Sequence, residues 1–156
     1  MMNVPYKIVC LCFLALTLFS VFSIFYTVYI FYGTKFAVNG FETQILSVTV
    51  DENLQQIVMQ LKLYNRYWVD LKVKYLSYKL FHNYREITTG EKFFSNPIDI
   101  PRYSTCYLNL TFSLNIDDLR TYNGIWTLYI KRMILITPIK EVIKEEMEIS
   151  SEVIIP

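Results

Sequence analysis

The feature that most constrains this chain is an uncharged apolar stretch near its start, Ile8 to Tyr32. At a rise of about 1.5 Å per residue, a helix of this length crosses the roughly 30 Å hydrocarbon core of a bilayer with length to spare. Its β-branched and aromatic residues are poor helix formers in water, but inside a bilayer the backbone amides can pair only with one another. We therefore predict one transmembrane helix over residues 8–32, after a short tail of residues 1–7.

Both ends of this stretch carry residues suited to a membrane surface. Lys7 and Lys35 flank it, and Tyr32 is one of several tyrosines near its ends, where amphipathic rings favour the headgroup level. We predict that Lys7, Tyr32 and Lys35 lie at the membrane interface. The N-terminal tail carries the α-amino group and Lys7, against Lys35 alone on the other side. This bias favours an inside N-terminus and an extracytoplasmic C-terminal domain in a single-pass membrane protein.

A cleaved signal peptide is the main alternative to a retained anchor. Such a peptide has an apolar region of about 7–15 residues followed by a cleavage site made of small residues. The stretch in this chain is longer and runs into Phe31 to Phe36 (FYGTKF), which is not such a site. The sequence therefore favours a retained anchor.

The rest of the chain is predicted to hold one domain. Residues 33–40 are expected as a linker, and residues 41–156 are enough for a domain with its own core. Basic and acidic residues nearly cancel, with a formal net charge of +1, and no run of lysine and arginine can neutralise a nucleic-acid backbone. The composition thus argues against nucleic acid as a partner. Cys106 is the only cysteine beyond the apolar stretch, so the domain has no internal disulfide.

From Phe41 onward apolar residues alternate with polar ones, a pattern typical of half-buried strands. The alternation changes phase at Tyr75 and Leu76, which predicts a β-bulge. Pro97 and Pro101 mark an extended connection, because proline cannot pair within a central strand. About seven strands with frequent turns predict an antiparallel β-sandwich. The expected strands are 41–50, 56–65, 69–81, 85–94, 104–115, 125–136 and 142–149.

One face of each strand is predicted to form the core. In the strand over residues 104–115, Leu108, Leu110 and Phe112 share one face and Asn109 lies on the other. Asn109 begins an Asn-Leu-Thr sequon, so on an exported domain it is a candidate glycosylation site. The residues expected to be largely buried are Leu61, Leu63, Leu71, Val73, Leu108, Leu110, Phe112, Trp126, Leu128 and Ile130.

Several short stretches share a pattern with a known family. They are a strand ending at Asn65, the segment Tyr78-Lys79-Leu80, the step Ile100-Pro101 and the strand Leu108–Phe112. Together, the run from Ile57 to Leu114 resembles the LEA14-like, or water-stress-and-hypersensitive-response, domain of group 2 late embryogenesis abundant proteins. Arg66 stands where that family has proline. The resemblance implies an immunoglobulin-like or fibronectin type III-like sandwich, in many members behind a membrane helix. It implies no catalytic residues and a protective, lipid-associated or adaptor role.

The sequence contains no catalytic constellation. His82 is the only histidine and is expected in an exposed hairpin loop over residues 82–84. Cys106 is expected to face the core as an inert thiol. No glycine-rich phosphate loop, CxxC pair or HExxH stretch occurs. We therefore predict a protein that is not an enzyme and that holds no cofactor and no metal.

Two classes of function remain. The first is a non-enzymatic, membrane-anchored β-sandwich that binds, protects or acts as an adaptor at the membrane surface. Its expected partners are the lipid bilayer, membrane lipids or envelope proteins. The second is a structural subunit of a pilin-like surface filament, since such subunits also join a hydrophobic helix to a β-sandwich. Pilins carry a basic and a small residue just before the apolar run, which Tyr6-Lys7-Ile8 does not supply. Both classes allow a homo-oligomer.

The connection from Asn65 to Trp68 is predicted to lie beside the anchor. If the first strand leads away from the membrane and the second returns, this connection lies at the membrane end of the sandwich. There Arg66, Tyr67 and Trp68 suit the interface, with the rings at headgroup depth and the guanidinium on phosphate. The alternative is that Trp68 closes the end of the core.

Overall fold

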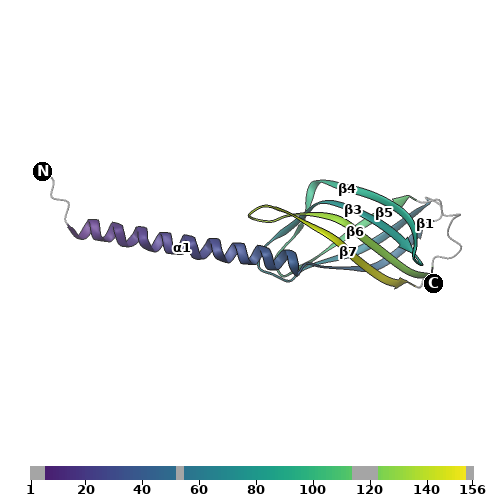
Figure 1. The fold of residues 1–156 in the computed structure, drawn as a ribbon, viewed down its shortest axis with the longest axis horizontal. Helices are drawn as coiled ribbons and strands as arrows, with labels where there is room; N and C mark the ends of the chain where they lie inside the picture. Colours follow the sequence, from purple (N-terminus) through teal and green to yellow (C-terminus); the bar gives the residue numbers. More distant parts are fainter. Residues whose placement is uncertain (1–5, 52–54, 114–122, 154–156) are drawn as a thin grey trace.

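The computed structural model describes residues 6–51, 55–113 and 123–153. One long helix is followed by a β-domain, and the start of α1 and the end of β7 lie at opposite ends of the elongated molecule (Figure 1). The elements are α1 (Tyr6–Asn39), β1 (Glu42–Asp51), β2 (Gln56–Asn65), β3 (Leu71–His82), β4 (Arg85–Ile100), β5 (Ser104–Ser113), β6 (Gly124–Ile136) and β7 (Glu141–Val153).

The seven strands form two antiparallel sheets, which confirms the predicted sandwich. One sheet has the order β1-β2-β5, and the other has the order β4-β3-β6-β7. The chain crosses between the sheets after β2, β4 and β5. In the constant-type immunoglobulin arrangement the fourth strand joins the sheet of the first strand, whereas here β4 pairs with β3.

The direction of the strands gives the sandwich a helix end and a far end. β1 leads away from α1, so the connections β2–β3, β4–β5 and β6–β7 return to the helix (Figure 1). A backbone hydrogen bond of 3.1 Å from the Tyr103 amide to the Tyr67 carbonyl joins the first two of these connections. The predicted position of the Asn65–Trp68 connection beside the helix is therefore confirmed.

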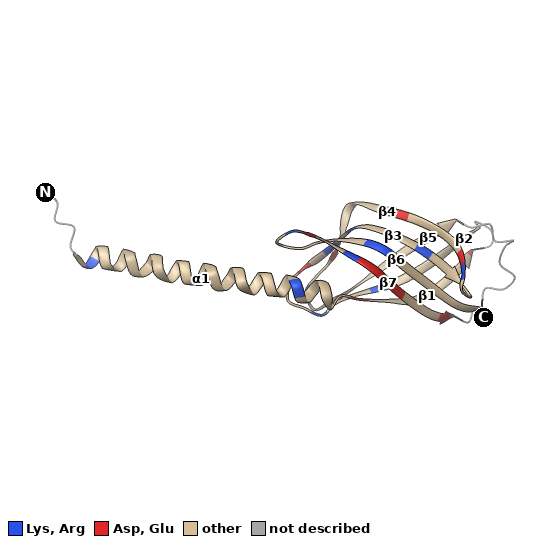
Figure 2. Ribbon diagram, in the orientation of Figure 1, with Lys and Arg blue, Asp and Glu red and all other residues tan. Residues whose placement is uncertain are grey.

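α1 is longer than the apolar stretch from which it was predicted. It ends at Asn39 rather than Tyr32, so the residues 33–39 expected as a linker are helical. Figure 2 shows it without charged side chains between a lysine near each end. Its most apolar window has a mean hydropathy of 2.7 and no buried residues, so it is long and apolar enough to cross a membrane.

Three hydroxyl groups in the apolar part of α1 are paired inside the helix. Thr17 donates to the Phe13 carbonyl at 2.7 Å, Ser20 to the Leu16 carbonyl at 2.9 Å and Thr27 to the Ser23 carbonyl at 2.8 Å. Each bond reaches back four residues, a pairing that needs no water. These polar side chains therefore add little to the polarity of the exposed surface of α1.

The core lies between the two sheets and follows the predicted strand faces. All ten residues expected to be largely buried are buried, with exposures between 0% and 6%. Trp126 is the largest fully buried side chain of the domain. Cys106 is only half-buried and packs against the rim of this core.

The predicted phase change in the third strand is confirmed by the register. Pairing of β3 with both neighbours shifts between Val73 and Tyr75, and the inward positions then continue from Leu76. The fourth strand is longer than expected, since β4 continues to Ile100 through the region predicted as a connection. Pro97 fits there because β4 is an edge strand and because the register with β3 jumps from Ile98 to Phe93.

The predicted exposed position of His82 is wrong. His82 is the last residue of β3, is 7% exposed and packs on Trp126 with ring centroids 4.5 Å apart. The hairpin loop is only Asn83-Tyr84, since His82 already pairs with Arg85. Both loop residues have positive φ angles, 48° and 67°, which match the twist of a tight hairpin.

The other strand ends differ from expectation by a few residues. β1 starts one residue after Phe41, β6 starts at Gly124, and β7 extends to Val153. The expected end of the fifth strand at residue 115 lies outside the described residues, as do residues 1–5 of the predicted tail.

Leu110→Ala tests the sandwich core. Leu110 is 1% exposed, so its truncation leaves a cavity, and we expect the free energy of unfolding to fall by about 2–5 kcal/mol. Ser113→Ala, on the exposed face of the same strand, is the matched control and should change it by less than about 0.5 kcal/mol. Denaturant unfolding of the detergent-solubilised chain measures both, and equal stability of the two variants would contradict the strand phase.

Candidate functional site

The candidate site is the junction where the end of α1 meets the helix end of the sandwich. Gly33, Thr34, Ala37 and Val38 are the buried residues of α1. Their spacing of one, four and five positions places them on one face of the helix. Two of the four have little or no side chain, so the helix backbone can approach the sandwich closely.

Gly33 marks the closest approach. A Cβ atom at this position would lie 2.5 Å from Trp68 Nε1 and 2.5 Å from Val69 Cγ2, which is closer than real carbon contacts allow. Any side chain at residue 33 must therefore displace the β2–β3 connection. The Trp68 indole N–H is buried there and has no hydrogen-bond partner within the described residues.

Aromatic rings of α1 stack on rings of the β2–β3 connection. Tyr29 stacks on Trp68 with centroids 5.3 Å apart, and Phe36 stacks on Tyr67 with centroids 6.0 Å apart. Tyr67 and Trp68 are half-buried and also pack against the sandwich core. Trp68 thus contacts both the helix and the core.

Asn65 holds this connection in place. It is fully buried, and its amide nitrogen donates to the Val69 carbonyl at 2.7 Å and to the Ile100 carbonyl at 3.3 Å. Its side-chain oxygen accepts the Tyr67 amide at 3.1 Å. One asparagine therefore fixes the loop that carries both stacking rings and ties it to the end of β4. This gives a physical reason for asparagine at the end of β2.

Lys144 of β7 caps the end of α1 from the other sheet. Its ammonium donates to the Val38 carbonyl at 3.2 Å and to the Phe41 carbonyl at 3.0 Å, and it lies 5.5 Å from the Phe41 ring centroid. A cation is favourable at a helix C-terminus, where carbonyl groups lack partners. Burial lowers the pKa of Lys144, because the charged form is less well solvated there. The carbonyl groups and the ring offset part of that penalty.

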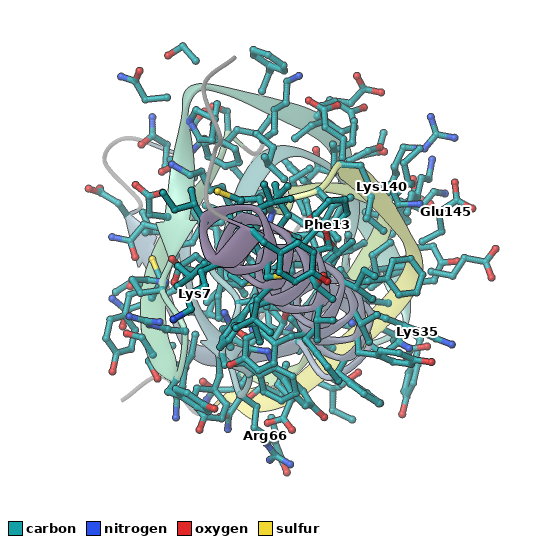
Figure 3. All side chains as sticks on the ribbon, turned by 90° about the vertical axis from the view of Figure 1, so that its left-hand side faces the viewer. Lys7, Phe13, Lys35, Arg66, Lys140 and Glu145 are labelled. Carbon is teal, nitrogen blue, oxygen red and sulfur yellow. The ribbon has the colours of Figure 1, made fainter. Side chains whose placement is uncertain are left out.

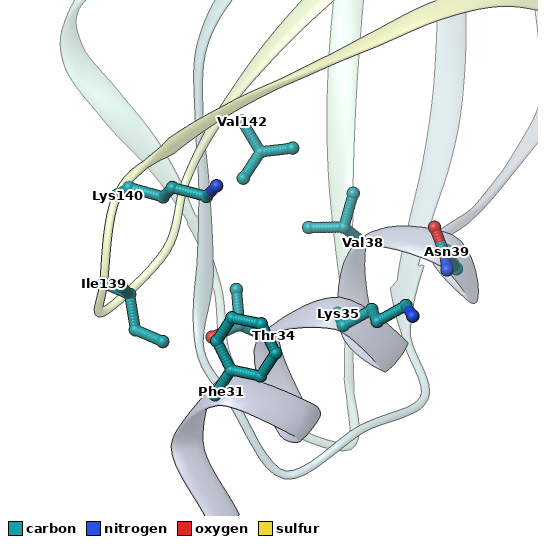
Figure 4. Close-up of a pocket in the computed structure, with 8 residues that line it drawn as sticks. All are labelled: Phe31, Thr34, Lys35, Val38, Asn39, Ile139, Lys140 and Val142. Carbon is teal, nitrogen blue, oxygen red and sulfur yellow. The ribbon is translucent and has the colours of Figure 1, made fainter. Parts of the chain in front are cut away.

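A groove of about 300 Å³ opens between α1 and the β6–β7 hairpin (Figure 4). Phe31, Val38, Ile139 and Val142 give it an apolar lining, and no acidic residue is among the residues that form it. The complete lining is Phe31, Thr34, Lys35, Val38, Asn39, Ile139, Lys140 and Val142.

Thr137 makes the tip of the β6–β7 hairpin rigid. It is 7% exposed, and its hydroxyl donates to the Lys140 carbonyl at 2.6 Å. The same oxygen accepts the Lys140 amide at 3.1 Å and the Ile139 amide at 3.3 Å. The turn thereby holds Ile139 and Lys140 in a defined position beside the helix.

The residues predicted from sequence as interface candidates fall into separate groups. Lys7 is exposed in the first turn of α1, far from the sandwich, and Tyr32 is exposed and stacks on Phe36 at 6.4 Å. Lys35 lines the groove. Arg66 is exposed and pairs with Glu42 at 2.8 Å. In the view along the helix, Lys35, Lys140 and Arg66 lie around the helix axis (Figure 3).

Asn109 lies away from the junction. It is exposed on β5, as the strand phase predicted, and the second sheet does not cover it. Its glycosylation stays a prediction.

Sequence reasoning placed Tyr67 and Trp68 beside the helix but missed the other residues that join helix and sandwich. Gly33 and Ala37 carry a signal, because two small residues four apart at the end of an apolar helix indicate close packing. Thr137 and Lys144 have no such signal in the sequence, because their partners are set by the three-dimensional fold. Lys144 contacts carbonyl groups more than one hundred residues earlier in the chain.

A second hollow of about 410 Å³ lies on the outer face of the four-stranded sheet. It is lined by Phe81, Tyr84, Tyr129 and neighbouring polar residues, and its lysine, Lys79, already pairs with Glu86. Within the described residues no group of three or more histidine, cysteine, aspartate or glutamate side chains is placed to hold a metal ion. The groove beside the helix is therefore the better candidate site.

No family model matches the chain, and no curated protein matches it. Several solved structures match the chain at low sequence identity. One is a crystal structure of a protein from Archaeoglobus fulgidus, with 16% identity over 74% of this chain and 99% of that chain and a TM-score of 0.45. Another is the solution structure of a protein described as a putative late embryogenesis abundant protein. It has 14% identity, the match covers 87% of this chain and 88% of that chain, and the TM-score is 0.46. A third is the crystal structure of a protein described as putative ApaA from Bordetella pertussis. It has 12% identity, the match covers 70% of this chain and 92% of that chain, and the TM-score is 0.46. These values carry no conclusion about family or function, and the resemblance to LEA14-like domains stays a prediction.

Gly33→Ala tests the docking of the helix. Helix propensity alone predicts that alanine stabilises α1 by about 1 kcal/mol relative to glycine. The contact with Trp68 and Val69 predicts the opposite effect. The added methyl group overpacks the junction, so the docked state of the helix should be destabilised by about 1–3 kcal/mol. Amide hydrogen exchange of residues 34–41 measures the effect. Slower exchange in the variant would contradict the close approach.

Proposed function

We propose that this chain is a non-enzymatic, membrane-anchored β-sandwich that binds partners at the membrane surface. The observation that carries the proposal is the continuity of α1, which runs without a break from an uncovered apolar segment into the base of the sandwich. A domain mounted in this way keeps a fixed height and tilt above the bilayer. Its partners are then membrane lipids or envelope proteins within reach of that fixed position.

The dimensions of α1 support the anchor. Lys35 follows Lys7 by 28 residues, which is about 42 Å along a helix. This distance matches a bilayer of about 40–45 Å including both headgroup layers. Large apolar side chains between the two lysines are left uncovered by the described domain, for example Phe22, which is 75% exposed. The internal pairing of the helix hydroxyl groups suits the same environment.

The junction supports retention of the helix rather than its removal as a signal peptide. Cleavage at the end of the apolar stretch would remove Tyr29 and leave Trp68 without its stacking partner. Cleavage beyond residue 38 would also uncover the sandwich surface that now covers Ala37 and Val38. The buried helix residues therefore act as part of the domain.

The absence of an assembled reactive group supports a non-enzymatic role. His82 is packed on Trp126 at the far end of the sandwich, and Cys106 lies on the three-stranded sheet. They belong to different sheets, so this histidine and this cysteine do not form a base and nucleophile pair. We therefore propose a binding, protective or adaptor role rather than catalysis.

A pilin-like filament subunit is the second candidate. The uncovered surface of α1 favours it, because a filament would bury that surface against neighbouring helices. In this case the chain would form a homo-oligomer through the helix, and the sandwich would face outward.

Cell fractionation and protease treatment of intact cells test the anchor. We expect the chain in the membrane fraction after alkaline carbonate washing, with the sandwich removed by external protease. Phe19→Arg together with Phe22→Arg should lower the membrane-bound fraction, since an arginine near the bilayer centre costs about 2.5–3.5 kcal/mol. The matched control replaces both phenylalanines by leucine. A soluble chain that lacks residues 6–32 would contradict the anchor, and release of the chain in sheared filaments would favour the second candidate.

A further inference from the structure

We propose that the groove between α1 and the β6–β7 hairpin binds the headgroup of one anionic phospholipid, with the phosphate between Lys35 and Lys140. The proposal rests on the membrane-anchored function above and names a lipid class for it. The groove volume of about 300 Å³ is within the range of small-ligand sites.

The charges of the groove favour an anion. Lys35 is on α1 and Lys140 is on the β6–β7 hairpin, and neither ammonium takes part in an ion pair between described residues. Other lysines of the sandwich do pair, such as Lys72 with Asp99 and Lys74 with Glu141, both at 2.7–2.8 Å. The carboxylate next to Lys140 in sequence, Glu141, is thus already occupied by Lys74. α1 contains no acidic residue at all, so nothing on the helix neutralises Lys35.

The depth of the groove favours a lipid as the source of that anion. If Lys7 lies in one headgroup layer, the 28-residue separation places Lys35 in the other, because the helix rise gives about 42 Å. Lys140 lines the same groove on the hairpin side (Figure 4). In Figure 4 the Lys35 ammonium points away from the hairpin, so its flexible side chain must turn toward Lys140 before both ammonium groups form charge-assisted hydrogen bonds to one phosphodiester.

The apolar residues of the groove suit the rest of a lipid molecule. Phe31 and Ile139 are 55% and 47% exposed, and they lie on opposite sides of the groove, one on the helix and one on the hairpin. An acyl chain can lie along them while the headgroup stays at the lysines. A free phosphate ion would leave Phe31 and Ile139 exposed.

Native mass spectrometry of the full-length chain released from nanodiscs tests the proposal. The nanodiscs contain phosphatidylcholine and phosphatidylglycerol in equal amounts. We expect one phosphatidylglycerol to stay bound in preference to phosphatidylcholine. Each of Lys35→Gln and Lys140→Gln should weaken its apparent affinity about fivefold, and the double variant about twenty-five-fold, since one lysine near the surface contributes about 1 kcal/mol. Lys131→Gln, on the exposed surface of β6, is the matched control and should not change it.

The outcomes separate this proposal from the anchor. Equal retention of the two lipids, or a double variant that binds phosphatidylglycerol as tightly as the original chain, would overturn the lipid site while the chain still enters nanodiscs. Failure of the original chain to enter nanodiscs would instead overturn the anchor, and with it the site. Displacement of the bound lipid by millimolar inorganic phosphate would show a simple anion site and overturn the lipid assignment.

Discussion

The close contact between the helix backbone at Gly33 and the β2–β3 connection is the interaction on which the arrangement of the molecule depends. Because residue 33 has no side chain, Trp68 and Val69 lie against the helix itself. Ala37 continues the same narrow face one turn later. Asn65 holds the connection from within the sandwich, and Lys144 of the other sheet holds the helix end. Both sheets therefore contribute to one junction.

This junction determines what the domain can do. A flexible linker would let a β-sandwich sample many orientations above a membrane, whereas a continuous helix fixes one. The fixed orientation brings the β6–β7 hairpin beside the helix, where Ile139 and Lys140 meet Phe31 and Lys35. The groove exists only because the helix continues past the apolar stretch. The proposed lipid site and the proposed rigid mount would thus both depend on the same contact.

The features that were predicted correctly from the sequence are those that depend on local periodicity. Alternation identified the strand faces, so Leu110 and Trp126 were placed in the core, and the phase change at Tyr75 indicated the bulge. The helix end was missed because Gly33 and Lys35 are typical of a linker, and the packing that keeps residues 33–39 helical comes from distant strands. His82 was misplaced because the tight turn uses Tyr84, which is an unusual residue at positive φ. Sheet order and the groove depend on contacts between distant segments, which periodicity does not encode.

The most direct test of the account is the distance distribution between one spin label on the helix and one on the sandwich. Labels at Ser20→Cys and Ser113→Cys, in a chain whose Cys10, Cys12 and Cys106 are replaced by alanine, report this distance by pulsed electron paramagnetic resonance. Both labelled positions are exposed, so the labels do not disturb the junction. The docked helix predicts a single narrow distribution in nanodiscs. A broad distribution, as a flexible linker over residues 33–40 would give, would contradict the account.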